Sequence, residues 1–214
     1  MSYLQNIQSA VTAGTATLYW ERDAACSPQG IRYQIGLDGA KRTEVTRTHV
    51  TLEGLQPDTE YAVRIEAVSD RALDAETVQI RTACQKRRID VTREPYLAKG
   101  DGAALNTGAI QRALDDCTAS DAVYFPAGVY RTGALRLHSD MEIYLEEGAV
   151  LQGTADPADY LPKIPSRFEG IEMECYASLL NMGWLDHTAG ANCGNVLIHG
   201  KGTIASGGQE LALA

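Results

Sequence analysis

The first 84 residues contain short segments in which apolar and polar positions alternate. Alternation with a period of two places one face of a segment against a core and the other in solvent, so it predicts β-strands. Turn signals such as Asp38-Gly39 separate the segments. The expected strands cover residues 16–20, 31–37, 50–55, 62–68 and 77–82. Several short strands without a helical pattern predict an all-β domain, a β-sandwich, over residues 1–84.

The hydrophobic pattern changes after residue 94. A glycine-rich turn, Lys99-Gly100-Asp101-Gly102, precedes a segment whose apolar residues recur at i, i+3, i+4 and i+7 from Ile110 to Cys117. That spacing predicts a short amphipathic helix, and Asn106 or Thr107 is a suitable N-cap for it. A helix with one apolar stripe can cover the open end of a β-solenoid and protect its edge strands.

A strand-turn-strand unit then recurs three times. The copies are 123–130, 142–151 and 195–204, and the first two lie about 20 residues apart, a repeat length typical of solenoids. A long insertion, about 155–190, separates the second copy from the third, and such insertions usually line the binding face of a scaffold. The pattern predicts the first rungs of an incomplete parallel β-helix over 94–214, joined to the sandwich by a polar linker at 85–93.

Charge and cysteine usage narrow the classes of partner. The chain of 214 residues carries a net charge of −9 and no basic stripe, which argues against nucleic acid as a partner. An acidic polysaccharide could bind only at a locally basic site. Five cysteines, with no close pair, fit free thiols in a reducing compartment better than a disulfide framework or a metal site. We therefore expect no metal and no cofactor.

Two observations bear on the compartment. No apolar run approaches the roughly 18 residues of a membrane span, so no membrane partner is expected. The first residues, Met1-Ser2-Tyr3-Leu4-Gln5-Asn6, contain neither a basic region nor an apolar one, so no signal peptide is visible. We expect a cytoplasmic location and leave secretion open.

The N-terminal domain resembles fibronectin type III domains. The segment Leu55-x-Pro57-x-Thr59-x-Tyr61, which precedes a well-alternated strand, is similar to their tyrosine corner, in which a tyrosine hydroxyl bonds back to the preceding turn. Trp20 matches the core tryptophan of an early strand. The resemblance covers about 80 residues and implies a structural role for both aromatic residues, so that this domain would act as a spacer or packing partner.

The second part of the chain resembles glycoside hydrolase family 28, the polygalacturonases and related pectin hydrolases, over essentially all of residues 94–204. The matching segments are Lys99-Gly100-Asp101-Gly102, Ala109-Ile110-Gln111-x-Ala113, Phe125-Pro126-Ala127-Gly128-x-Tyr130, Tyr144-Leu145-Glu146-Glu147-Gly148-Ala149, Asp156-Pro157-x-Asp159-Tyr160 and Gly200-x-Gly202-Thr203-Ile204. Residues 166–172 and 175–179 look like the bacterial branch, which often carries a fibronectin-like domain and acts from chain ends. The resemblance implies a right-handed parallel β-helix.

The same resemblance implies hydrolysis of α-1,4 galacturonide bonds with inversion, with pectic oligo- or polygalacturonate as substrate of the complete enzyme. Inversion needs two carboxyl groups about 6.5–9.5 Å apart, so that a water molecule fits between them and the sugar. In the family, three aspartates in Asn-Thr-Asp and Asp-Asp motifs, followed by His-Gly and Arg-Ile-Lys motifs, lie beyond the Gly-x-Gly-Thr-Ile segment. We therefore assign no catalytic residue within this chain and expect it to be inactive alone.

Three strings imitate these motifs. Asp115-Asp116 closes the predicted helix, His199-Gly200 lies inside a rung, and Asn106-Thr107 is followed by Gly108 rather than by aspartate. We assign none of them to an active site.

Arg167, in the insertion, is the candidate substrate contact, because a guanidinium group can bind a uronate carboxylate through two hydrogen bonds. A structural ion pair of Arg167 with Glu169 or Glu172 is the competing interpretation. The insertion also holds Lys163 and Tyr176.

Two further functions stay open. One is a non-catalytic carbohydrate-binding or adhesion module on the same scaffold. The other is a relative of pectate lyases, which would need Ca²⁺ held by clustered carboxylates, and no such cluster is evident in the sequence. The segment Leu211-Ala212-Leu213-Ala214 offers no polar cap to the last rung. We therefore expect an apolar edge there and a tendency of the chain to self-associate.

Overall fold

The computed structural model describes residues 3–23, 30–70, 72–185 and 192–208. The chain divides into two compact units, Met1–Gln85 and Lys86–Ala214. Each unit has a hydrophobic core of its own.

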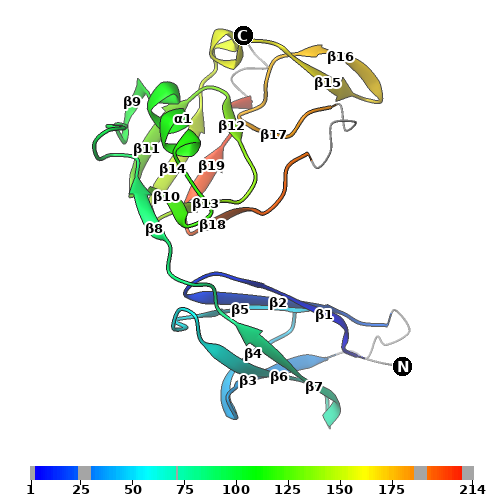
Figure 1. Cartoon of the computed structure of the whole chain (residues 1–214). Helices are drawn as coiled ribbons and strands as arrows, with labels where there is room; N and C mark the ends of the chain where they lie inside the picture. Colours follow the sequence, from blue (N-terminus) through cyan, green and yellow to red (C-terminus); the bar gives the residue numbers. More distant parts are fainter. Residues whose placement is uncertain (1–2, 24–29, 71, 186–191, 209–214) are drawn as a thin grey trace. The chain divides into compact units, whose positions relative to one another are not determined.

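The first unit is an antiparallel β-sandwich (Figure 1). Its strands are β1 (Gln5–Val11), β2 (Thr15–Glu21), β3 (Arg32–Leu37), β4 (Ala40–Val45), β5 (His49–Glu53), β6 (Glu60–Val68) and β7 (Ala72–Arg81). One sheet has the order β1-β2-β5 and the other β4-β3-β6-β7. Trp20 and Tyr33 pack edge to face between them, with ring centroids 4.9 Å apart.

Two strands of this sandwich are absent from the sequence prediction. β1 has no buried residue among its seven positions and β4 has none among its six. Without a buried face neither strand produces clear alternation, so the hydrophobic pattern could not find them. The tyrosine corner is confirmed, because the backbone N–H of Gln56 donates a hydrogen bond of 2.8 Å to the Tyr61 hydroxyl.

The second unit is built mainly from parallel strands, as predicted, and contains one antiparallel hairpin, β15–β16. Its elements are β8 (Arg87–Asp90), β9 (Asp101–Leu105), α1 (Thr107–Asp115), β10 (Asp121–Phe125), β11 (Gly128–Thr132), β12 (Leu135–Leu137), β13 (Met141–Leu145), β14 (Ala149–Gly153), a 3₁₀-helix (Pro157–Tyr160), β15 (Ile164–Phe168), β16 (Ile171–Cys175), β17 (Leu180–Met182), β18 (Val196–Gly200) and β19 (Thr203–Ala205). Three parallel sheets have the orders β8-β10-β13-β18, β9-β11-β14-β19 and β12-β17. The rungs are therefore the first coils of a β-helix.

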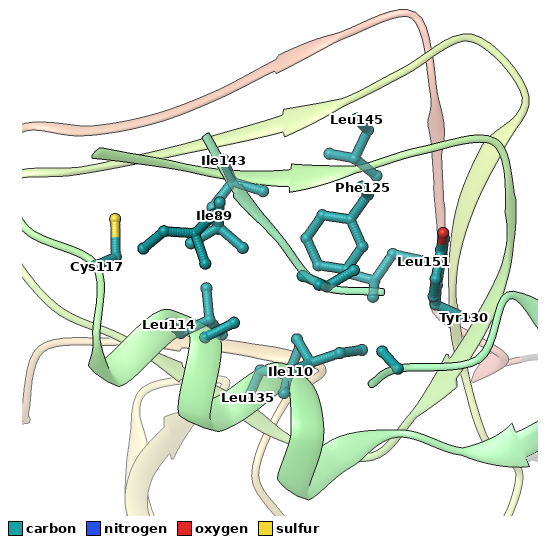
Figure 2. Close-up of a cluster of buried hydrophobic side chains, with 14 of the residues drawn as sticks. Ile89, Ile110, Leu114, Cys117, Phe125, Tyr130, Leu135, Ile143, Leu145 and Leu151 are labelled. Carbon is teal, nitrogen blue, oxygen red and sulfur yellow. The ribbon is translucent and has the colours of Figure 1, made fainter. Parts of the chain in front are cut away.

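Each rung lies in direct register with the next. Val123 pairs with Ile143, and Ile143 pairs with Ile198, so that equivalent faces of successive strands line the same interior. Helix α1 closes one end of this interior. Figure 2 shows Ile110 and Leu114 of the helix pointing toward the side chains of the strands, and both helix residues are buried.

The segment 85–93 differs from the expected linker. Residues Arg87–Asp90 form β8, which pairs in parallel with β10. The strand was missed because Ile89 is its only buried residue. Ile89 and Val91, which follows the strand, are 7% and 0% exposed and belong to the β-helix core. The basic run in this segment is not a solvated hinge, since Arg87 forms an ion pair of 2.7 Å with the buried Asp121.

Asn106 occupies the N-cap position of α1 but does not cap it. Its side chain turns toward the glycine-rich turn instead, where Oδ1 accepts from the Lys99 N–H at 2.7 Å and Nδ2 donates to the carbonyls of Lys99 and Ala104 at 3.0 and 2.9 Å. Asn106 is 4% exposed. It therefore fixes the turn to the start of the helix.

The glycine-rich turn needs its glycines for close approach. A Cβ on Gly100 would lie 3.2 Å from the Gly128 Cα and 3.1 Å from the Tyr130 ring. Asp101 accepts from the backbone N–H groups of Ala103 and Ala104, both at 2.9 Å. These hydrogen bonds hold the pKa of the Asp101 carboxyl below its usual value.

Candidate functional site

The insertion between β14 and β18 carries the candidate substrate contacts. Its first part is tied to the rungs by two backbone hydrogen bonds: the Thr154 N–H donates to the Thr132 carbonyl at 3.1 Å, and the Ala134 N–H donates to the Asp159 carbonyl at 3.0 Å. Within this part, the Thr154 hydroxyl donates to Asp159 at 2.6 Å, and the Tyr160 hydroxyl donates to the Thr154 carbonyl at 2.7 Å. A Cβ on Gly133 would lie only 2.1 Å from the Asp159 carbonyl oxygen, so glycine is required where the insertion crosses the rung. The base of the insertion is thereby held in place.

Arg167 lies in the hairpin β15–β16, directly opposite Glu172. Arg167 Nη2 donates to Glu172 Oε1 at 2.6 Å, and the two side chains are 59% and 61% exposed. Of the two interpretations drawn from the sequence, the structure thus contains the ion pair. Because both side chains are exposed, the pair contributes little to stability, about 0–1 kcal/mol, and the remaining guanidinium donors stay accessible to a ligand.

Two further cations in or beside the insertion contact exposed aromatic rings. The Lys163 ammonium lies 5.0 Å from the Tyr176 ring centroid, and the Arg136 guanidinium carbon lies 3.4 Å from that of Trp184. The rings are 50% and 63% exposed. Arg136 also donates to the Gly183 carbonyl at 3.2 Å. Such cation–π contacts hold a cation beside an apolar surface, an arrangement suited to a sugar that carries a carboxylate.

Sequence reasoning missed the pair Arg136–Trp184. The two residues are far apart along the chain and meet because β12 pairs in parallel with β17, next to which Trp184 lies. The signal available in the sequence was that Trp184 is one of only two tryptophans and falls within the insertion.

The three motif look-alikes have structural partners. Asp115 accepts from the Gln111 amide at 2.8 Å and Asp116 from the Tyr96 hydroxyl at 3.0 Å, both at the end of α1. Thr107 accepts from the Gly133 N–H at 2.8 Å. These side chains support local structure around the capping helix.

His199 and Gly200 also serve the rung. His199 Nε2 lies 2.9 Å from Glu142 Oε1, and the Lys86 ammonium lies 3.3 Å from the other oxygen of Glu142. Burial alone would raise the pKa of Glu142, but the hydrogen bond and charge of His199 and the charge of Lys86 outweigh it, so the pKa lies below its usual value. Gly200, with φ of +119°, is fixed by sterics, because a Cβ there would lie 2.0 Å from the Leu145 carbonyl oxygen.

The outer face of the sheet β8-β10-β13-β18 is a ladder of stacked side chains. The Tyr124 and Tyr144 rings stack with centroids 5.9 Å apart, and His199 meets Tyr144 edge to face at 5.0 Å. The Arg88 guanidinium lies 4.6 Å from the Tyr124 ring. A hydrogen bond to Glu146, together with burial, raises the pKa of Tyr124 to about 12. Because these rings stack on one another, the ladder stabilises the rungs rather than offering open faces to a sugar.

The described residues contain no metal-binding cluster, no disulfide and no membrane-spanning helix. No group of three His, Cys, Asp or Glu side chains there could hold a metal ion. The cysteines of this part of the chain, Cys84, Cys117, Cys175 and Cys193, are free thiols, and Cys26 lies outside it. Across the same residues, no helix has the length and apolar character needed to cross a membrane.

Comparison with known proteins identifies both units. Residues 2–82 match the fibronectin type III domain model. The chain is 38% identical over 162 residues to an exo-poly-alpha-D-galacturonosidase of Dickeya chrysanthemi, an alignment that covers 74% of this chain and 26% of that protein. The structure is similar to a family 28 exopolygalacturonase of Yersinia enterocolitica, with a TM-score of 0.79 and 26% identity over 95% of this chain and 41% of that one. The chain thus spans less than half the length of each of these relatives.

Proposed function

Since this chain belongs to glycoside hydrolase family 28 and carries an N-terminal fibronectin type III-like domain, we propose that it is the N-terminal part of an enzyme that hydrolyses α-1,4 galacturonide bonds of pectin with inversion. The observation that carries the proposal is the 38% identity to a protein named as an exo-poly-alpha-D-galacturonosidase. The parallel rungs in direct register agree with a scaffold for a long polysaccharide.

We further propose that these 214 residues alone release no sugar. Their sequence contains no Asn-Thr-Asp string. The side chains that imitate catalytic motifs are occupied by structural hydrogen bonds, as Asp115, Asp116 and His199 illustrate. An inverting reaction needs two suitably spaced carboxyl groups on either side of the sugar, and this proposal assigns them to residues beyond this sequence.

A chimeric enzyme tests the proposal. Residues 1–204 would replace the matching N-terminal part of the Yersinia enterocolitica exopolygalacturonase, and reducing-sugar release from polygalacturonate would be measured for the chimera and for the 214-residue chain. We expect release by the chimera and none by the chain. A folded chimera without activity would contradict the assignment of the scaffold, and sugar release by the chain alone would contradict the assignment of its catalytic groups.

Arg167 is proposed as a substrate contact of this enzyme. In the chimera, Arg167→Ala should raise KM for polygalacturonate, because the substrate carboxylate loses the guanidinium group that binds it. Glu172→Gln is the matched variant, since it releases Arg167 from its ion pair and should not raise KM. An unchanged KM in Arg167→Ala would refute the role.

A non-catalytic carbohydrate-binding module is the second candidate function. The exposed pairs Arg136–Trp184 and Lys163–Tyr176 favour it, because aromatic faces beside cations can bind acidic sugars without chemistry. Saturable binding of an oligogalacturonide by the chain, combined with an inactive chimera, would favour a binding module over part of a hydrolase.

Self-association is proposed through the last rung. Leu211–Ala214, from which the expectation was drawn, lie outside the described residues. Among the described strands, β17, β18 and β19 are each at the edge of a parallel sheet, and Ile204 is 43% exposed. Unpaired strand edges favour pairing between chains. Sedimentation should therefore show concentration-dependent association, and a single monomeric species at all concentrations would contradict it.

A further inference from the structure

A basic seam runs along one edge of the N-terminal sandwich. β4 is the edge strand of one sheet and β5 the edge strand of the other, and residues 46–48 connect them. Two open hollows of about 590 and 600 Å³ lie along this connection, and both are lined by Arg47 and His49. Arg42 lines the first hollow and Arg22 the second. We call this surface, defined by Arg22, Arg42, Arg47 and His49, the basic seam.

The arginines of the sandwich that the structure describes divide into two groups. Arg32, Arg64 and Arg81 each form an ion pair with a glutamate or aspartate of the same unit. Within the described residues, the three arginines of the basic seam form no ion pair. Residues 1–84 carry 8 basic and 11 acidic side chains, so acidic groups are in excess overall. The basic seam therefore gathers guanidinium groups without an ion pair at one edge of a domain that is acidic overall.

The seam also offers a fixed geometry and hydrogen-bonding groups. Arg42 Nη2 donates to the Glu53 carbonyl at 3.1 Å, which anchors the guanidinium across the edge from β4 to β5. Four threonines line the two hollows: Thr43, Thr46, Thr48 and Thr51. Hydroxyl groups both donate and accept hydrogen bonds, and they complement the hydroxyl groups of a sugar. Two carboxylate residues, Glu21 and Glu53, lie along the same lining and limit the excess positive charge.

We propose that the basic seam binds an acidic polysaccharide, namely a de-esterified stretch of the galacturonan named in the proposed function, on which this inference rests. Each uronate unit presents one carboxylate for a guanidinium fork and several hydroxyl groups for threonine. The mixture of three arginines with two glutamates suits a ligand of moderate charge density better than nucleic acid, whose phosphates demand a more uniformly basic surface. The sandwich then holds the polysaccharide near the enzyme rather than serving as a spacer.

Binding of an oligogalacturonide by the full 214-residue chain tests the inference. The double variant Arg42→Ala/Arg47→Ala should bind at least about tenfold more weakly, because each arginine lost removes charge-assisted hydrogen bonds. Arg64→Ala is the matched control, an exposed arginine on β6 that already pairs with Glu66, and it should bind as the unchanged chain does. Affinity should also fall as salt is added, and the fully methyl-esterified oligosaccharide should bind more weakly than the free acid.

Repeating the titrations in an Arg167→Ala background separates this site from the insertion. Under the proposal, the loss caused by Arg42→Ala/Arg47→Ala persists in that background. Loss of binding only through Arg167→Ala would overturn the basic seam while leaving the proposed function intact. Absence of binding to the unchanged chain, equal binding of the methyl ester, or tighter binding of single-stranded nucleic acid than of the oligogalacturonide would each overturn the inference. Hydrolysis by the chimera decides the proposed function independently.

Discussion

Replacing Asn106 by alanine should destabilise the β-helix unit by about 3 kcal/mol. The change removes three hydrogen bonds of 2.7–3.0 Å between the side chain and the backbone of Lys99 and Ala104. Each bond contributes about 1 kcal/mol net, and a buried backbone group left without a partner costs about 1–3 kcal/mol. Solvent entry satisfies part of the loss, which leaves the total near 3 kcal/mol. Helix capping adds nothing, because the side chain does not cap α1.

Hydrogen exchange resolved by peptide mass spectrometry measures this effect. Amides of β11 and β14 that exchange through opening of the unit should exchange roughly 150-fold faster, the factor that corresponds to 3 kcal/mol. Peptides of β2 and β6 serve as an internal reference and should not change. Asn106→Asp keeps the acceptor and loses both donors, so its effect should be intermediate.

Arg112→Ala provides the matched control on the same helix. It removes only a 3.4 Å contact with the Tyr96 carbonyl and introduces a better helix former. Equal acceleration in Asn106→Ala and Arg112→Ala would refute the reasoning. Faster exchange of the β2 and β6 peptides would refute the premise that the Asn106 hydrogen bonds stabilise the second unit alone.

Three further predictions concern single positions. Gly200→Ala should destabilise the β-helix by at least about 2 kcal/mol through steric strain. Gly194→Ala is the control, because a Cβ there meets nothing within 4 Å, and it should change the free energy of unfolding by no more than about 0.5 kcal/mol. The denaturant midpoints of the two variants and the unchanged chain measure the difference. The hydrogen bond from Arg87 holds the pKa of Asp121 well below its usual value. Its stabilisation is therefore complete above the unfolded-state pKa of about 3.9 and declines as pH falls below it, and Asp121→Asn should flatten that decline in urea titrations between roughly pH 5 and 3. Tyr61→Phe should cost the sandwich about 1 kcal/mol by removing one hydrogen-bond acceptor, and an unchanged melting curve would contradict this.

The sequence predicts those parts of the fold whose pattern is local. β2, β6 and β13 alternate buried and less buried residues, and α1 has a single apolar stripe, so their hydrophobic periods are legible. β8 was missed because it contains only one buried residue, Ile89. Strand detection from alternation thus depends on how much of a strand the core covers.

The candidate sites depend on contacts that the sequence does not encode locally. Asn106 looks like a helix cap in the sequence, but its side chain binds the backbone of Lys99, a contact that forms only when the glycine-rich turn folds against the helix. Trp184 reaches Arg136 through a pairing of strands more than forty residues apart. The basic seam requires Arg22 and Arg47, which belong to different segments, to line the same hollow. Proximity of this kind follows from topology rather than from spacing.

The pairing of the hairpin β15–β16 has a consequence for which parts of the second unit can vary independently. Among the described strands, β15 and β16 pair only with each other, whereas β14 and β19 pair in register on either side of the insertion. Mutation and recombination can therefore lengthen, shorten or exchange the hairpin without altering the repeat that supports it. If Arg167 contacts substrate as proposed, a change of substrate preference through this hairpin requires no change in the pairing of β14 with β19.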